Sequence, residues 1–170
     1  MHGARAQRAH AFFHMGKWDE ALAALDEHFH TKRLTAYIYH YNRAIFLVSA
    51  GRISASQEAY SEFQKQLEQL PKVKLGKNTL YIISEQYRLL LAFQKDNNET
   101  SLREYLDFLP TTFYKPPTLM NKIALNYYQG LYELHYGDVQ QAMSHFDFIL
   151  KTESTAWYRN AAQTERQKLL

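Results

Sequence analysis

The amino-acid sequence predicts an all-α protein, and three observations favour this class over one that contains β-sheet. Glycines and prolines are few, six and four among 170 residues, and most mark breaks between apolar periodic segments, as in helices joined by short turns. Within those segments apolar residues recur at intervals of three and four, the period of a helix. Tyr and Phe, 13 and 10 in number, suit wide interfaces between helices.

The first predicted hairpin turns at Gly16. Apolar residues recur from Ala6 to Phe13 and stop at this glycine, which we expect to cap the helix with a positive φ. Trp18 then opens a second helix that runs to about Phe29, and the two acids that follow Trp18 lie where the helix dipole favours negative charge.

The second predicted hairpin comprises helices over residues 35–50 and 53–70, with Gly51 at its turn and Pro71 at its end. A basic connector that contains a glycine follows over residues 72–78.

The third predicted pair is a long apolar-rich helix over residues 79–95 and a shorter one over residues 99–109, separated by polar residues and stopped by Pro110. We expect residues 111–117 to form an extended loop, because two successive prolines cannot lie inside a helix.

The fourth predicted hairpin joins residues 118–136 to residues 139–151 through Gly137. A ninth helix then follows, and we expect its exposed face to hold Ala156, Arg159, Gln163, Arg166 and Gln167. A polar terminal helix is what an open helical stack needs to stay soluble.

The turns recur at a spacing typical of a repeat array. Gly16, Gly51, Asp96 and Gly137 lie 35, 45 and 41 residues apart. The chain resembles the tetratricopeptide repeat (TPR) family, whose unit is a helical hairpin of 34 residues. Three units hold residues of the family's signature types: Ala9, Phe12, Gly16, Trp18, Ala21 and Leu25; Ala44, Leu47, Gly51, Ile53, Ser56 and Tyr60; Gly130, Gly137, Val139, Ala142 and Phe146.

Three features depart from the family pattern. The connectors over residues 72–78 and 111–117 are longer than the tight family spacing. The third unit keeps little beyond Leu89, Ala92 and Tyr105, and Glu133 stands where the family prefers a large apolar residue. The resemblance implies a right-handed α-α superhelix (solenoid) of about four TPR-like hairpins plus a C-terminal capping helix. We expect a single domain over residues 1–170, a fragment of a longer protein, with units over about 3–33, 35–71, 79–110 and 118–152 and a cap over 155–169.

Composition limits the compartment and the chemistry. The chain has no cysteine, which excludes disulfides and thiolate chemistry and suits a reducing compartment. No run approaches the roughly 18 apolar residues that span a bilayer, so we predict no transmembrane segment. We expect a cytoplasmic protein, or the cytosolic part of a membrane-anchored one.

No catalytic or cofactor motif is present in the sequence, which contains no HExxH, GxSxG, P-loop or GxGxxG pattern. We therefore predict no enzyme and no cofactor. His10 and His14 lie one helical turn apart, but two imidazoles without a nearby acid fall short of the ligands that a zinc site requires, so no metal site is predicted.

Basic residues in the connectors raise nucleic-acid binding as a less favoured alternative. They are Lys32, Arg33, Lys72, Lys74 and Lys77. With a net charge of only +3, we interpret them as solvated charges, because nucleic-acid binding depends on neutralising many phosphates.

The TPR resemblance implies that the first helix of each pair lines a concave groove. The predicted groove residues are His10, His14, Tyr41, Asn42, Gln86, Tyr127, Tyr128 and His135. Aromatic rings and amides of this kind can stack on and hydrogen-bond to an extended peptide backbone. The competing interpretation is that individual residues, Phe13 and Tyr87 especially, pack between neighbouring hairpins.

Asn42 occupies a position at which clamp-type members of the family hold a peptide. The lysine and asparagine that complete the clamp in the first unit are replaced by Ala6 and His10, so a two-carboxylate clamp is not predicted. The sequence favours a non-catalytic scaffold that binds a protein or peptide of unknown identity. The alternative is an assembly element, such as a homodimer, or a sensor element attached to a membrane or regulatory domain outside this chain.

Overall fold

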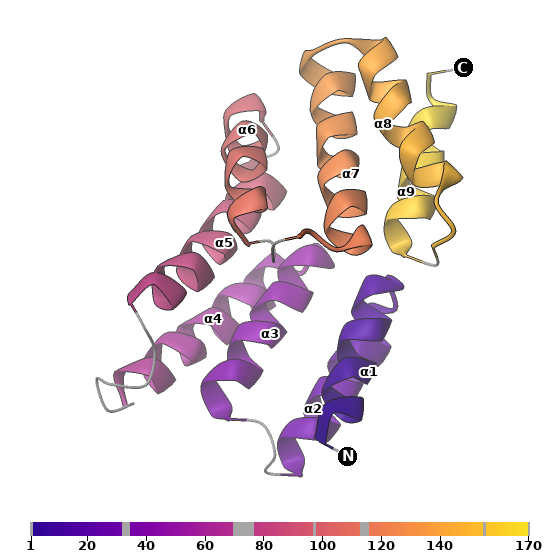
Figure 1. Ribbon diagram of the computed structural model, residues 1–170. Coiled ribbons are helices and arrows are strands. Elements are labelled where there is room, and N and C mark those ends of the chain that lie inside the picture. Colours follow the sequence, from indigo (N-terminus) through magenta and orange to yellow (C-terminus); the bar gives the residue numbers. More distant parts are fainter. Residues whose placement is uncertain are drawn as a thin grey trace. The chain divides into compact units, whose positions relative to one another are not determined.

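The computed structural model describes residues 2–31, 35–69, 77–96, 98–112, 116–154 and 156–169. Every regular element in these ranges is a helix (Figure 1), which confirms the all-α class; the superhelical arrangement remains a prediction. The elements are α1 (His2–His14), α2 (Trp18–His30), α3 (Ala36–Ser49), α4 (Ile53–Glu68), α5 (Lys77–Asp96), α6 (Glu99–Phe108), the 3₁₀ turn η1 (Leu109–Thr112), α7 (Leu119–Tyr136), α8 (Val139–Lys151) and α9 (Trp157–Gln167).

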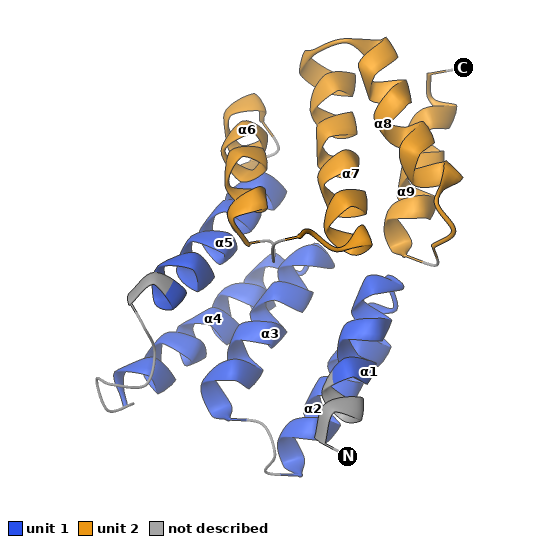
Figure 2. Ribbon diagram, in the orientation of Figure 1, with its two compact units in different colours: residues 1–95 blue, residues 96–170 orange. Residues whose placement is uncertain are grey.

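The chain divides into two compact units, residues 1–95 and 96–170 (Figure 2). The division falls at the last residue of α5 and so separates α5 from α6, the two helices of the third predicted pair. None of the helices described combines the length and the hydropathy that crossing a lipid bilayer requires.

Helix bounds agree with the predictions to within a few residues, and two segments differ. α5 begins at Lys77, inside the predicted connector, whose residues 72–76 lie outside the described ranges. Thr111 and Thr112 belong to η1 instead of an extended loop. Their hydroxyls donate to the carbonyls of Phe108 and Leu109, at 2.7 and 2.8 Å, so they satisfy acceptors left over where α6 ends.

The turns at Gly16 and Gly51 share one geometry. Both glycines have a positive φ, 71° and 72°, as predicted for Gly16. In each turn the residue after the glycine donates its N–H at 2.9 Å to the carbonyl five residues earlier, Lys17 to Phe12 and Arg52 to Leu47. This is the hydrogen bond of a Schellman cap, and it ends α1 and α3 in the same way.

The turn at Gly137 is built differently and explains the unusual Glu133. Gly137 has φ −128°, outside the left-handed region. The Glu133 carboxylate accepts the Asp138 N–H at 2.9 Å, and Asp138 in turn caps α8 by accepting the N–H groups of Gln140 and Gln141. A carboxylate therefore stabilises this turn from the position where the family prefers an apolar side chain.

Small buried residues lie at matching positions in three hairpins, α1–α2, α3–α4 and α7–α8. The pairs are Ala9 and Ala21, Ala44 and Ser56, and Gly130 and Ala142; all are buried, and the five with side chains are at most 1% exposed. The Ser56 hydroxyl donates to the Ala44 carbonyl at 3.0 Å. A Cβ on Gly130 would lie 2.5 Å from Cε1 of Phe146, so any larger residue would force this buried ring to move.

Aromatic rings join successive elements within each unit. In unit 1, Phe13 stacks on Phe46 at 4.5 Å between ring centroids, and Tyr60 of α4 stacks on Tyr87 of α5 at 3.9 Å. In unit 2, Tyr105 of α6 meets Tyr128 of α7 edge-on at 4.9 Å between ring centroids, and the core around them includes Ile123, Phe146 and Ile149.

The predicted exposed face of the last helix is only partly correct. Ala156 is buried, and Arg159 donates to the carbonyls of Leu150 and Thr152 at 2.6 and 2.7 Å. Arg166 pairs with Asp147 at 2.6 Å. Arg159 binds there because the last carbonyls of a helix have no partner within it, whereas Arg166 binds a carboxylate on the side of α8.

Replacing Gly51 by Ala should lower the free energy of unfolding by about 1–2 kcal/mol, because an alanine Cβ disfavours the left-handed backbone. No atom lies within 4 Å of the added Cβ, so the loss reports backbone conformation alone. Urea unfolding measures it. Gly51→Asn, which tolerates this conformation better, is the control, and an Ala variant as stable as wild type contradicts the turn geometry.

Replacing Ser56 by Ala should cost about 1–3 kcal/mol, because it leaves the Tyr87 hydroxyl buried without a partner. Tyr87 is 3% exposed and its hydroxyl lies 3.0 Å from the Ser56 hydroxyl. The double variant Ser56→Ala/Tyr87→Phe removes the orphaned group and should be more stable than Ser56→Ala in chemical unfolding. If the double variant is no more stable than Ser56→Ala, the loss of stability does not come from an unpaired Tyr87 hydroxyl.

Candidate functional site

The first helices of successive hairpins contact each other in unit 1, which is the arrangement that a groove on this face requires. The His10 ring of α1 meets the Phe46 ring of α3 edge-on, 5.4 Å between centroids. The Tyr41 hydroxyl of α3 donates to Oε1 of Gln86 in α5 at 2.9 Å. We name the surface of α1, α3 and α5 that carries His10, His14, Tyr41, Asn42 and Gln86 the first-helix face.

The histidines of the first-helix face are disfavoured in their charged form. Loss of water lowers the pKa of both His10 and His14, and the neighbouring His10 charge lowers the pKa of His14 further. Nδ1 of His14 is buried without a hydrogen-bond partner in the described structure. Among the residues described, no group of three or more His, Cys, Asp or Glu side chains could hold a metal ion.

The polar side chains of the first-helix face differ in whether they already make a hydrogen bond within the protein. Tyr41 already uses its hydroxyl on Gln86, and burial raises the pKa of this hydroxyl, so it acts as a neutral donor. The half-buried Asn42 makes no side-chain hydrogen bond to the described part of the chain. Asn42 and the exposed edge of His10 are therefore the groups best placed to meet a ligand.

The predicted residues of unit 2 are divided between core and surface. Tyr128 is 4% exposed and packs edge-on against Tyr105 at 4.9 Å, so it belongs to the core and not to an open groove. Tyr127 lies half-buried against Trp157, at 5.3 Å, and desolvation raises its pKa. His135 is exposed. The TPR resemblance placed both Tyr127 and Tyr128 in the groove, and two adjacent tyrosines give no signal of which one points inward.

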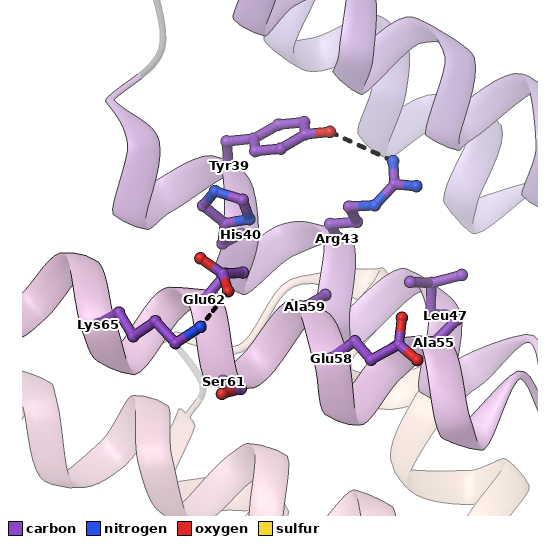
Figure 3. A pocket seen from close by; sticks show the side chains of 10 residues that line it. All are labelled: Tyr39, His40, Arg43, Leu47, Ala55, Glu58, Ala59, Ser61, Glu62 and Lys65. Carbon is purple, nitrogen blue, oxygen red and sulfur yellow. Dashed lines mark hydrogen bonds and ion pairs between the residues drawn. The ribbon is translucent and has the colours of Figure 1, made fainter.

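A polar cleft of about 600 Å³ lies between α3 and α4 in unit 1 (Figure 3), and none of the predicted groove residues lines it. We call it the α3–α4 cleft. Its lining residues are Tyr39, His40, Arg43, Leu47, Ala55, Glu58, Ala59, Ser61, Glu62 and Lys65.

A hydrogen-bond network that begins on α2 fixes one wall of the α3–α4 cleft. The Tyr39 hydroxyl and Arg43 Nη1 both donate to Oδ1 of Asp26, each at 2.7 Å. Tyr39 also stacks on Phe29, 4.2 Å between centroids. Burial and the Asp26 carboxylate raise the pKa of Tyr39 to about 12. The tyrosine thus stays neutral and holds the arginine in place.

The opposite wall carries charges of both signs. Glu62 accepts from Lys65 at 2.5 Å, and this contact lowers the pKa of Glu62. Glu58 lies one helical turn before Glu62 and has no ion pair with the described residues. His40 and Ser61 also line the cleft, but no hydrogen bond joins them, so this geometry does not activate the serine. The arrangement suits binding of a polar group.

Sequence reasoning missed the α3–α4 cleft, although a signal was present. Tyr39 and Arg43 lie four residues apart on one helix, as do Glu58 and Glu62 on the next, and such pairs share a helix face. The sequence did not reveal that Asp26, from the preceding hairpin, accepts hydrogen bonds from Tyr39 and Arg43.

The basic residues that raised nucleic-acid binding fall largely outside the described residues. Four of them lie in connectors outside the described ranges: Lys32, Arg33, Lys72 and Lys74. Lys77 is the first residue of α5. The described structure therefore adds nothing in favour of a nucleic-acid interface.

Lowering the pH from about 7.5 to 5.5 should destabilise the protein. Desolvation lowers the pKa of His10 and His14 below the ordinary value of about 6.5. The unfolded chain therefore binds protons first as the pH falls, and the free energy of unfolding decreases. Urea unfolding at both pH values measures the decrease.

A His10→Gln/His14→Gln variant should lose less stability over this interval than wild type. Its remaining pH dependence comes partly from His40 and His145, whose pKa values are also lowered by desolvation. An equal loss in variant and wild type would show that the two histidines are not the cause.

No protein-family model matches this chain, and comparisons with curated proteins and with solved structures likewise find no match.

Proposed function

We propose that this chain is a non-catalytic, TPR-like helical-repeat scaffold that binds a protein or peptide segment on its first-helix face. The observation that carries the proposal is the repetition of one hairpin design. In both hairpins the small buried residues lie the same number of residues before and after the turn glycine. They are Ala9 and Ala21 around Gly16, and Ala44 and Ser56 around Gly51, and both glycines have a positive φ.

Repetition of this kind supports a binding scaffold because each hairpin adds a similar strip of surface beside the last. Within unit 1, contacts from His10 to Phe46 and from Tyr41 to Gln86 join the strips of α1, α3 and α5. The resulting face offers rings, a free amide and neutral histidines. These groups can bind a peptide backbone without requiring a charged ligand.

A peptide selected from a random phage-displayed library against the full chain provides the test. Its affinity, measured by fluorescence polarisation, should fall about tenfold in Asn42→Ala, since a lost hydrogen bond to a bound ligand costs about 1 kcal/mol or slightly more. Asn160→Ala, at an exposed position of α9 in the other unit, is the matched control and should bind like wild type.

Two outcomes would contradict the proposal. One is a selected peptide whose affinity is unchanged in Asn42→Ala and in Gln86→Ala, which would place binding elsewhere. The other is failure to enrich any peptide together with a concentration-dependent dimer in light scattering. That result would favour the assembly element.

A further inference from the structure

Another cleft, of about 410 Å³, lies between α4 and α5 within unit 1. We call it the α4–α5 cleft. Its lining residues are Gln57, Tyr60, Ser61, Gln64, Ser84, Glu85, Tyr87, Arg88 and Leu91. Gln86, which belongs to the first-helix face, is absent from this lining, so the two surfaces use different sides of α5.

The aromatic part of the α4–α5 cleft provides an apolar seat. The rings of Tyr60 and Tyr87 are stacked, with centroids 3.9 Å apart and planes 12° apart, and the half-buried Leu91 lies beside them in the lining. Tyr87 uses its hydroxyl on the buried Ser56. Tyr87 is only 3% exposed, so the apolar surface that a ligand can reach belongs to the half-buried Tyr60 and Leu91. An apolar side chain is the matching ligand group.

The charged residues of this cleft neutralise each other. Arg88 Nη2 and Nε contact the two carboxylate oxygens of Glu85, at 2.6 and 3.0 Å, and this contact lowers the pKa of Glu85. All other lining residues are uncharged. A charged ligand group would lose water here without meeting a free counter-charge, which is unfavourable. By contrast, the α3–α4 cleft holds Glu58, which has no ion pair with the residues that the structure describes.

The rim of the cleft carries a row of free hydrogen-bonding groups on α4. Gln57, Ser61 and Gln64 follow one another at helical spacing, and all three are exposed. None of them makes a side-chain hydrogen bond within the described part of the chain. Gln57 and Gln64 are seven residues apart, about 10.5 Å along a helix, and three residues of an extended peptide span about 10 Å.

We propose that the α4–α5 cleft binds an uncharged, extended peptide segment that places one apolar side chain against Tyr60 and Leu91. Gln57 and Gln64 bind backbone groups of that segment three residues apart, because an amide side chain both donates and accepts. This inference rests on the proposed function of peptide binding, but it concerns a different surface.

The test uses the full chain and three capped pentapeptides, Ac-Ala-Ala-Leu-Ala-Ala-NH2 and its counterparts with Lys or Asp at the centre. The NMR signals of the Gln57 and Gln64 side-chain amides report binding. Saturable shifts are expected with the Leu peptide, and the Lys and Asp peptides should bind at least tenfold more weakly. Equal shifts with all three, or none that saturate, would overturn the proposal.

Variants assign the binding to this cleft, with peptide affinity read from backbone amide shifts of α4 and α5. Gln57→Ala/Gln64→Ala should weaken the Leu peptide at least tenfold, and Ser61→Tyr, which fills the cleft from an exposed position, should abolish binding. Gln163→Ala, an exposed amide of α9, should change nothing. Undiminished binding in the double variant contradicts the proposal, with circular dichroism confirming that each variant is folded.

One further variant separates this inference from the proposed function. Asn42→Ala leaves the α4–α5 cleft intact and should bind the Leu peptide with unchanged affinity. A loss in Asn42→Ala without a loss in Gln57→Ala/Gln64→Ala would locate this peptide on the first-helix face and overturn the present proposal alone.

Discussion

The close crossing of paired helices at small residues is the constraint on which the rest of this structure depends. Ala44 and Ser56 are fully buried where α3 crosses α4. Where α7 crosses α8, the Phe146 ring packs directly against the backbone of Gly130. Larger side chains at these points would force the helices apart. The larger apolar residues beside each crossing then have fixed positions, and so do the turns that join the helices.

The crossing at Ser56 also connects packing within a hairpin to packing between hairpins. One hydroxyl bonds the Ala44 carbonyl within the pair and the Tyr87 hydroxyl of the next helix. Tyr87 in turn stacks on Tyr60. A buried polar network is favourable only when every member has a partner, and here each hydroxyl does. The same contacts hold the aromatic stack that lines the α4–α5 cleft.

Much of the secondary structure follows from the sequence because its signals are local. Gly16 and Gly51 end their helices as glycine at a left-handed position allows, and helical periodicity located the helices to within a few residues. Local signals failed where a partner lay far along the chain. Arg159 and Arg166 looked solvent-facing, yet they bind to α8. Tyr128 looked available to a ligand, yet Tyr105 and Tyr158 surround it.

The sequence by itself determined the all-helical class, the turn glycines and the small residues at the crossings, because helix period, left-handed φ and steric volume are properties of short segments. Only the tertiary structure decided which polar groups remain free for a ligand. Whether Tyr41, Asn42 or Gln57 is already hydrogen-bonded depends on helices tens of residues away. The turn that opens with Gly16 could be read from the sequence, whereas the clefts beside α4 arise from how its neighbours α3 and α5 pack against it.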